Sequence, residues 1–170
     1  QFGAHAVAMR QFEAQRFVSP FGAPPTGILR ADPDDSDVSG DISGVWTVDD
    51  DLNFYARVAR GFRAPSVQGR LLFGDTISVA ESETVLSFEA GVKADLFEDR
   101  TRVGFNLFNY RVNDQQLTAV GGQTNFNTLI NADRTNGYGM ELDLESYVTD
   151  NFLVTFGASY NNTEIDDPNL

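Results

Sequence analysis

The 170-residue sequence contains no cysteine and a single histidine, His5. Without cysteine the chain can form neither a disulfide framework nor a thiolate nucleophile, and Cys-based zinc sites are excluded. One histidine also excludes a two-histidine metal site within the chain. We therefore expect no zinc or related transition-metal site in this sequence.

Positive charge is scarce as well. Lys and Arg number 12 against 25 Asp and Glu, which gives a net charge of −13 at pH 7. Proteins that bind nucleic acids present basic surfaces to the phosphates. The charge balance therefore argues against a nucleic-acid partner.

Long apolar runs are missing too. No run approaches the ~18 consecutive apolar residues of a membrane helix, so any membrane role would have to be played by strands. The chain is nevertheless 41% hydrophobic and contains 14 Phe residues. That much apolar surface excludes a disordered chain.

Three short acidic turns alternate with longer connections. The short turns lie at residues 48–52, 96–100 and 148–151, and the longer connections lie around residues 61–82 and 112–134. An antiparallel sheet with short turns at one end and long loops at the other is typical of bacterial outer-membrane barrels. Soluble β-sandwiches usually mix loop lengths at both ends.

The segments between turns alternate apolar and polar residues with the period of a strand. The clearest segment runs from Thr84 to Leu96, with Leu86 and Phe88 on one face and Glu89 and Lys93 on the other. We expect about seven such strands. The remaining ones lie in 2–18, 38–48, 54–59, 101–107, 138–145 and 152–161, and the first of these is compatible with a helix as well.

Two further features favour a barrel over a sandwich. Glycines lie on the polar faces, where they weaken a strand unless curvature or close approach requires them; these are Gly91, Gly104, Gly139 and Gly157. Aromatic residues also lie at strand ends, as in the interfacial girdles of membrane barrels; these are Tyr110, Tyr138, Tyr147, Phe152 and Tyr160.

The predicted fold is all-β, an antiparallel transmembrane β-barrel segment. Because its two edges cannot stay unpaired in lipid, we expect further strands from a longer parent chain.

The stretch from Tyr55 to Ser66, YARVARGFRAPS, resembles the strand-to-loop segment of TonB-dependent outer-membrane receptors. Three further segments are similar to that family and occur in the same order. They are Glu83–Lys93 with its EAGVK string, Phe108–Gln115 with its Asp-Gln pair, and Asn131–Ala132 followed by Gly137–Glu141. Together the resemblance covers roughly residues 45–165.

The resemblance implies a barrel of about 22 strands, of which residues 1–170 would form a part. It also implies a plug domain and a TonB-coupling segment, which are not recognisable in this chain. The expected function is uptake of a siderophore, a vitamin or a glycan fragment across the bacterial outer membrane. The implied partners are the TonB complex, outer-membrane lipid, lipopolysaccharide and a small nutrient ligand.

Candidate ligand contacts lie in the expected extracellular loops, because loops carry binding more often than scaffolds do. They are Arg63, Gln68, Arg70 and Gln123. Arginines near a receptor mouth can bind an anionic ligand in a bidentate manner. For Arg57, Arg60, Arg63 and Arg70 the alternative is pairing with carboxylates of the lumen or loops, or with lipopolysaccharide phosphates.

We expect no catalytic residues, no metal site and no cofactor. The acidic run 32–37 lacks the Gly and Glu of an EF-hand loop, and Glu141 and Asp143 are explained by a wet lumen lining. Two alternatives to the receptor interpretation stay open. One is a passive porin-like barrel, and the other is a soluble secreted β-sandwich that binds carbohydrate.

Overall fold

The computed structural model describes residues 2–8, 12–17, 22, 24–69, 71, 76–121 and 126–167. Its main feature is an antiparallel sheet of seven strands in the order β1-β4-β5-β8-β9-β10-β11. These strands are β1 (Phe2–Ala8), β4 (Asp34–Thr47), β5 (Leu52–Arg63), β8 (Glu83–Leu96), β9 (Thr101–Gly121), β10 (Phe126–Thr149) and β11 (Phe152–Asp166). Among the described residues, no helix is long and apolar enough to cross a membrane.

The two faces of the sheet follow the alternation in the sequence. The register aligns Phe54, Val92, Phe105, Leu142 and Ala158 across five strands, and it aligns Tyr55, Gly91, Asn106, Glu141 and Ser159 in the next row. Successive rows therefore alternate between an apolar face and a polar face. The predicted strands and their faces are confirmed for the central part of the sheet.

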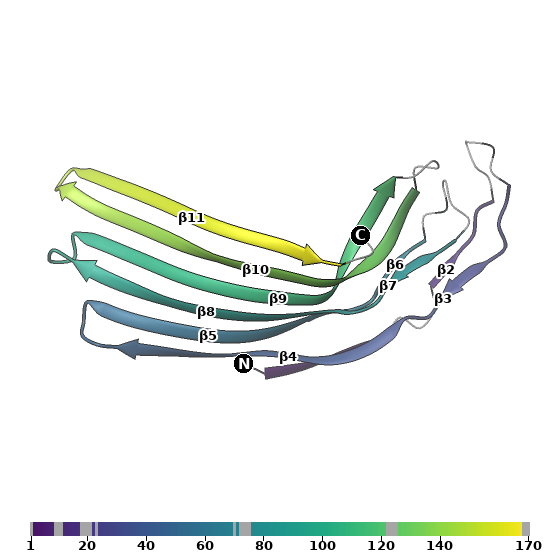
Figure 1. Cartoon of the computed structure of the whole chain (residues 1–170), viewed down its shortest axis with the longest axis horizontal. Coiled ribbons are helices and arrows are strands. Elements are labelled where there is room, and N and C mark those ends of the chain that lie inside the picture. The colour runs from purple at the N-terminus through teal and green to yellow at the C-terminus, as the bar shows by residue number, and fades with distance from the viewer. Residues whose placement is uncertain are drawn as a thin grey trace.

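The sheet forms one curved layer, and no second sheet made of the described residues covers its apolar face (Figure 1). Large apolar side chains on that face stay exposed, such as Ile42 at 66% and Phe156 at 55%. A soluble sandwich buries this face between two sheets, so the sandwich interpretation is wrong. Exposed apolar rows over a whole sheet face require lipid as their surroundings.

The stagger of the three short hairpins gives the tilt of the strands. Their last pairs are Thr47–Asn53, Leu96–Thr101 and Thr149–Phe152. Asn53 is level with Lys93 of β8 and, through the intervening strands, with Gly157 of β11. Toward the turns, Leu96 lies three residues beyond Lys93, and Phe152 lies five residues beyond Gly157. Five residues correspond to about 16 Å along the strands, and the four intervening strand spacings correspond to about 19 Å. If the three turns are level, the strands tilt by about 40°, as in outer-membrane barrels.

The short turns gather at one end of the sheet (Figure 1). Neighbouring turns are linked there, since Asp95 N donates to Asp51 O at 2.8 Å and the Arg100 guanidinium lies 3.2 Å from Asp150. Phe97, Glu98 and Asp99 adopt positive φ angles of 57°, 57° and 63°. The predicted grouping of short acidic turns at one end is confirmed.

The opposite end differs from the prediction in two ways. Residues 112–134 are mostly not a loop, because β9 and β10 continue to Gly121 and from Phe126 as one long hairpin. Two small sheets also occur there, β2 (Phe12–Ala14) with β3 (Leu29–Ala31) and β6 (Ser66–Gln68) with β7 (Ser78–Ala80). The opening segment is extended in β1 and β2, so the helical alternative for it is wrong in the described residues.

The buried apolar residues of the described part lie at this loop end rather than along the sheet. They are Leu71, Ala80, Val112 and Ala132. A single sheet has no interior of its own, so its apolar side chains depend on lipid. The extensions and loops instead bury side chains against one another.

The assignment of faces predicts how a charge is tolerated on β11. Phe156 lies on the apolar face of β11, midway between Phe152 and Tyr160. At mid-membrane, Phe156→Arg should reduce the stability of the barrel by about 2–4 kcal/mol. We expect this variant of the full-length protein to assemble poorly. The measurement is the fraction of the protein in outer membranes that changes mobility on boiling in SDS. Ser159→Arg is the matched control, because Ser159 lies on the polar face opposite Glu141. Equal assembly of both variants would contradict the face assignment.

Candidate functional site

The polar face carries more carboxylates than cations. Acidic residues of this face are Asp41, Glu89, Asp95, Glu141, Asp143 and Glu145, and the basic ones are Arg57, Lys93 and Arg102. Arg57 lies 3.4 Å from Asp41, and Arg102 lies 2.9 Å from Asp95. The carboxylates of β10 therefore give this part of the wall a net negative lining.

Aromatic rings on the polar face lie over glycines of the neighbouring strand. A Cβ on Gly137 would come within 2.2 Å of the Tyr110 ring, and a Cβ on Gly91 would come within 2.5 Å of the Tyr55 ring. The Tyr110 hydroxyl crosses β10 to form a hydrogen bond with Thr163 at 2.9 Å. Close approach of rings is therefore the reason for these glycines. Tyr110 accordingly belongs to the lumen wall, and its prediction as an interfacial girdle residue is wrong.

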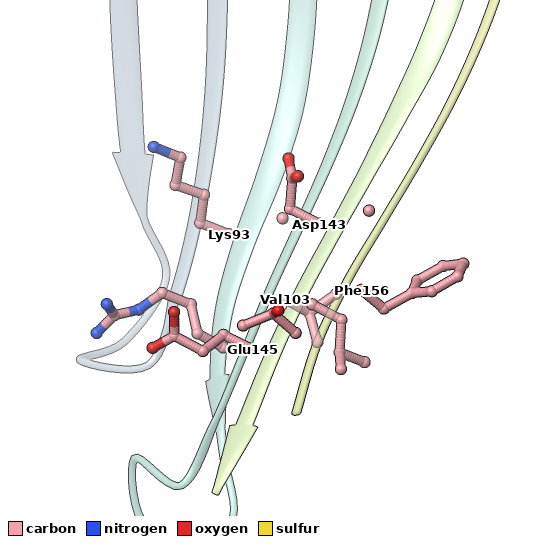
Figure 2. Close-up of a pocket in the computed structure, with 10 residues that line it drawn as sticks. Lys93, Val103, Asp143, Glu145 and Phe156 are labelled. Atoms are coloured by element: carbon pink, nitrogen blue, oxygen red, sulfur yellow. The ribbon is translucent and has the colours of Figure 1, made fainter. Parts of the chain in front are cut away.

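Two other glycines of this face have no ring over them. Gly104 and Gly157 flank Asp143 in a hollow of about 500 Å³ near the short turns, which Lys93 and Glu145 also line. Figure 2 shows Lys93 and Glu145 on one side of the sheet and Phe156 extending from the other. The hollow is thus a shallow charged recess of the wall. Among the described residues no group of acidic and histidine side chains is arranged to hold a metal ion.

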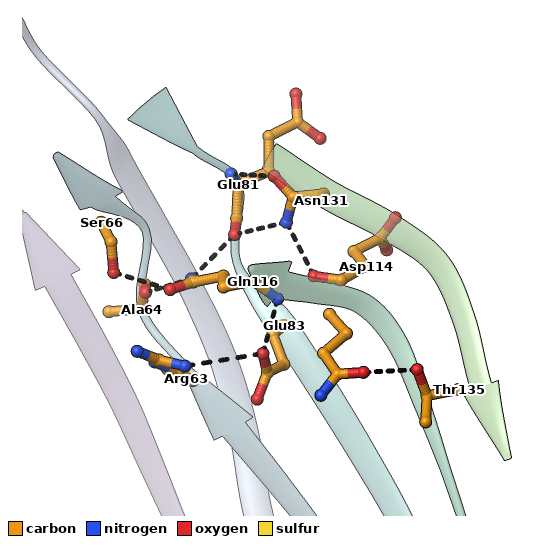
Figure 3. A network of polar contacts seen from close by, with 10 residues as sticks. Arg63, Ala64, Ser66, Glu81, Glu83, Asp114, Gln116, Asn131 and Thr135 are labelled. Carbon is orange, nitrogen blue, oxygen red and sulfur yellow. Dashed lines mark hydrogen bonds and ion pairs between the residues drawn. The ribbon is translucent and has the colours of Figure 1, made fainter. Parts of the chain in front are cut away.

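A network of hydrogen bonds at the loop end centres on Gln116, which is only 8% exposed (Figure 3). Its Nε2 donates to Ala64 O at 2.7 Å and to Glu81 O at 2.8 Å. Its Oε1 accepts from Ser66 Oγ at 2.6 Å, and its backbone N donates to Glu83 Oε2 at 2.7 Å. One side chain of β9 therefore joins both ends of the connection between β5 and β8.

Asn131 of β10 extends this network. Its Nδ2 donates to Glu81 O at 3.0 Å and to Asp114 O at 2.7 Å, and its Oδ1 accepts from Glu81 N at 2.8 Å. Asp114 has a positive φ of 55°, a conformation that Asp tolerates better than most residues. Ser78 Oγ accepts from Leu129 N at 3.0 Å, so β7 is attached to β10 at a second point.

The connection between β1 and β4 also contacts the others. Arg16 is 5% exposed, and its guanidinium donates to Pro24 O at 2.8 Å and to Leu71 O at 3.0 Å. The Phe12 ring lies against Gly69, where a Cβ would come within 2.2 Å of it. The described parts of three connections therefore contact one another at the loop end of the sheet.

The structure places the predicted ligand residues in different situations. Arg63 lies at the end of β5 and is 3.7 Å from Glu83, and Gln68 lies in β6 opposite Ser78. Arg70 and Gln123 lie outside the described residues. Arg60 pairs with Asp37 of β4 at 2.6 Å. Arg57, Arg60 and Arg63 are thus paired with carboxylates, as one of the two sequence-based interpretations expected.

Sequence reasoning missed the residues that organise this end. Gln116, Asn131 and Arg16 bind mainly backbone carbonyls, which have no signature in a sequence. A signal was present, because GFRAPS, the Asp-Gln pair and Asn131 all belong to the segments that resemble a known family. The structure shows that these segments converge on one network.

A tilted antiparallel sheet with an exposed apolar face, short turns at one end and long extensions at the other defines part of an outer-membrane β-barrel wall. A family model for the "TonB dependent receptor-like, beta-barrel" domain matches residues 11–169. The chain belongs to this family. This is a family of bacterial outer-membrane receptors rather than enzymes.

Solved structures of this architecture are similar to the chain. The ferric yersiniabactin uptake receptor FyuA from Yersinia pestis matches 84% of the chain with a TM-score of 0.69 and 20% identity. The FrpB iron transporter from Neisseria meningitidis matches 82% with a TM-score of 0.58 and 13% identity. The alcaligin outer-membrane receptor FauA from Bordetella pertussis matches 80% with a TM-score of 0.54 and 15% identity.

The chain spans between 21% and 24% of the length of these three structures. At these identities the likeness establishes the fold, an all-β segment of a larger barrel. No curated protein sequence matches the chain.

The packing of rings on glycines predicts different effects of two Gly→Ala changes in the full-length receptor. Gly137→Ala should displace the Tyr110 ring and break its bond to Thr163, at a cost of about 1–3 kcal/mol. Gly157→Ala should change stability by no more than about 0.5 kcal/mol, because its Cβ would lie 3.7 Å from Asp143 Oδ1. The measurement is urea-induced unfolding in lipid vesicles. Removal of the ring by Tyr110→Ala should reduce the cost of Gly137→Ala, and a cost unaffected by that change would argue against ring displacement.

Proposed function

We propose that the chain forms wall and extracellular loops of a TonB-dependent importer for an iron chelate. The observation that carries this proposal is the match of its sheet and hairpins to a ferric yersiniabactin uptake receptor, an iron transporter and an alcaligin receptor. Family membership over residues 11–169 supports the same reading. In this proposal the chain itself performs no chemistry.

Energy coupling would come from elsewhere in the parent protein. We propose that residues 1–170 are part of the barrel domain alone, and that a plug in the lumen contacts the TonB complex. The described wall offers such a plug a polar, mostly acidic surface with aromatic rings close to glycines. The size of such a barrel supports this arrangement. A barrel of many strands has a lumen too wide for the side chains of its wall to fill.

The ligand would bind at the loop end. We propose Arg63, Gln68, Arg70 and Gln123 as contacts, of which Arg63 supports the proposal best. Its side chain is 59% exposed although it lies 3.7 Å from Glu83, so the guanidinium retains donors for a carboxylate or phenolate oxygen of a chelate.

Outer-membrane lipid would contact the other face. Arg60 and Arg111 belong to the row that continues the apolar face toward the loops, and the register joins both to Leu86. Cations at the upper edge of an apolar belt are suited to lipopolysaccharide phosphates. We propose this contact for the outer leaflet.

The import proposal is tested in cells that lack the full-length receptor or carry it. We expect the receptor to confer saturable uptake of at least one ⁵⁵Fe-labelled chelate from a set comprising a hydroxamate, a catecholate and ferric citrate. A protonophore should abolish that uptake, because import through a plugged barrel requires energy from the inner membrane. Uptake that does not saturate and resists the protonophore would indicate a passive porin-like barrel instead.

A further inference from the structure

Two nearly buried polar side chains link connections that are far apart in the sequence. Gln116 belongs to β9, and its partners Ala64 and Glu81 belong to the connection between β5 and β8. Arg16 belongs to the connection between β1 and β4, and its partner Leu71 belongs to the β5–β8 connection. We call the β1–β4 connection the first loop, the β5–β8 connection the second loop, and the β9–β10 hairpin above Val112 the third loop.

The Gln116 side chain forms three hydrogen bonds and uses both Nε2 hydrogens. Each Nε2 hydrogen has its own backbone carbonyl, and Oε1 accepts from Ser66. A nearly buried amide that loses these partners cannot replace them with water without opening the site. The second loop therefore cannot leave the third loop while Gln116 stays in place.

Arg16 makes the corresponding link between the first and second loops. Its guanidinium donates both within the first loop, to Pro24 O, and across to Leu71 O of the second loop. The Phe12 ring packs against Gly69 beside it. A guanidinium with 5% exposure that is bonded to carbonyls on two loops strongly disfavours their separation.

We propose that the described parts of these three loops form one body, joined by Gln116 and Arg16, and do not move as independent flaps. The buried apolar residues support the part of this body formed by the second loop and the β9–β10 hairpin, because Leu71 and Ala80 come from the second loop and Val112 and Ala132 from β9 and β10. The proposal concerns the loops themselves, so it stands whether or not the receptor imports an iron chelate.

The test is hydrogen exchange measured by mass spectrometry on the full-length receptor in detergent, without ligand. Gln116→Leu removes the side-chain donors and acceptor, and we expect exchange to rise about tenfold in residues 64–69 and 77–82. If the loops form one body, exchange should also rise in residues 12–17, which Gln116 does not contact. Strand residues 84–96 should keep the exchange of the wild type.

Gln115→Leu is the matched control. Gln115 is the adjacent amide of β9, but its Oε1 accepts from Thr135 Oγ1 within the third loop. Loss of this bond perturbs the same strand without touching the second loop. We expect no change in residues 12–17 or 64–69. General destabilisation of β9 would instead raise exchange in both variants alike.

Ser66→Ala provides a milder change that keeps the Nε2 bonds, and its effect on residues 64–69 should be smaller than that of Gln116→Leu. It also serves if Gln116→Leu fails to assemble, as judged by mobility on boiling in SDS. Unchanged exchange in residues 64–69 for the assembled variants would overturn the role of Gln116. A rise confined to the second loop, with residues 12–17 unaffected, would overturn the single body.

Discussion

The need to pair every backbone amide and carbonyl in hydrocarbon determines the rest of this structure. In lipid an unpaired peptide group costs several kcal/mol, roughly as much as a small domain gains in total from folding. The central strands meet this need through continuous ladders from β4 to β11. The outer edges of β1 and β11 meet it only if further strands of the parent receptor pair with them. Short turns, tilt and alternating faces all follow from a sheet that has to close in a bilayer.

This constraint also moves packing away from the middle of the sheet. A wall one layer thick gives its apolar side chains to lipid and its polar ones to the lumen, so it has no core between two layers. Within the wall, aromatic rings pack against glycines of the neighbouring strand, as Tyr110 does against Gly137. Apart from Thr101 beside a short turn, the buried side chains of the described residues instead collect at the end of the sheet where the loops meet. The part of the chain that resembles an ordinary globular protein is therefore its loop end.

The predictability of each feature depends on how local its cause is. Alternation from Thr84 to Leu96 fixed the faces, because each residue's face follows from its own place in a strand. The position of Tyr110 was mispredicted because girdle and lumen aromatics differ only in parity, and its partner Gly137 is distant in sequence. The continuation of β9 and β10 through residues 112–134 was missed because apolar and polar residues do not alternate regularly there. The partners of Gln116 could not be predicted from residue types, since its Nε2 donates to two backbone carbonyls that are distant in sequence.

Joining loops at their bases has a consequence for binding. A loop that orders only when ligand arrives loses conformational entropy at that moment, and this loss reduces affinity. In this structure the ordering has already occurred, through nearly buried polar groups such as Gln116 and Arg16 that are bonded to carbonyls rather than to ligand-facing side chains. Side chains of the loops that take no part in these bonds are thereby left to vary with the ligand. A family that keeps the same segments at the loop bases can then change its specificity at the loop surface without losing the framework that presents it.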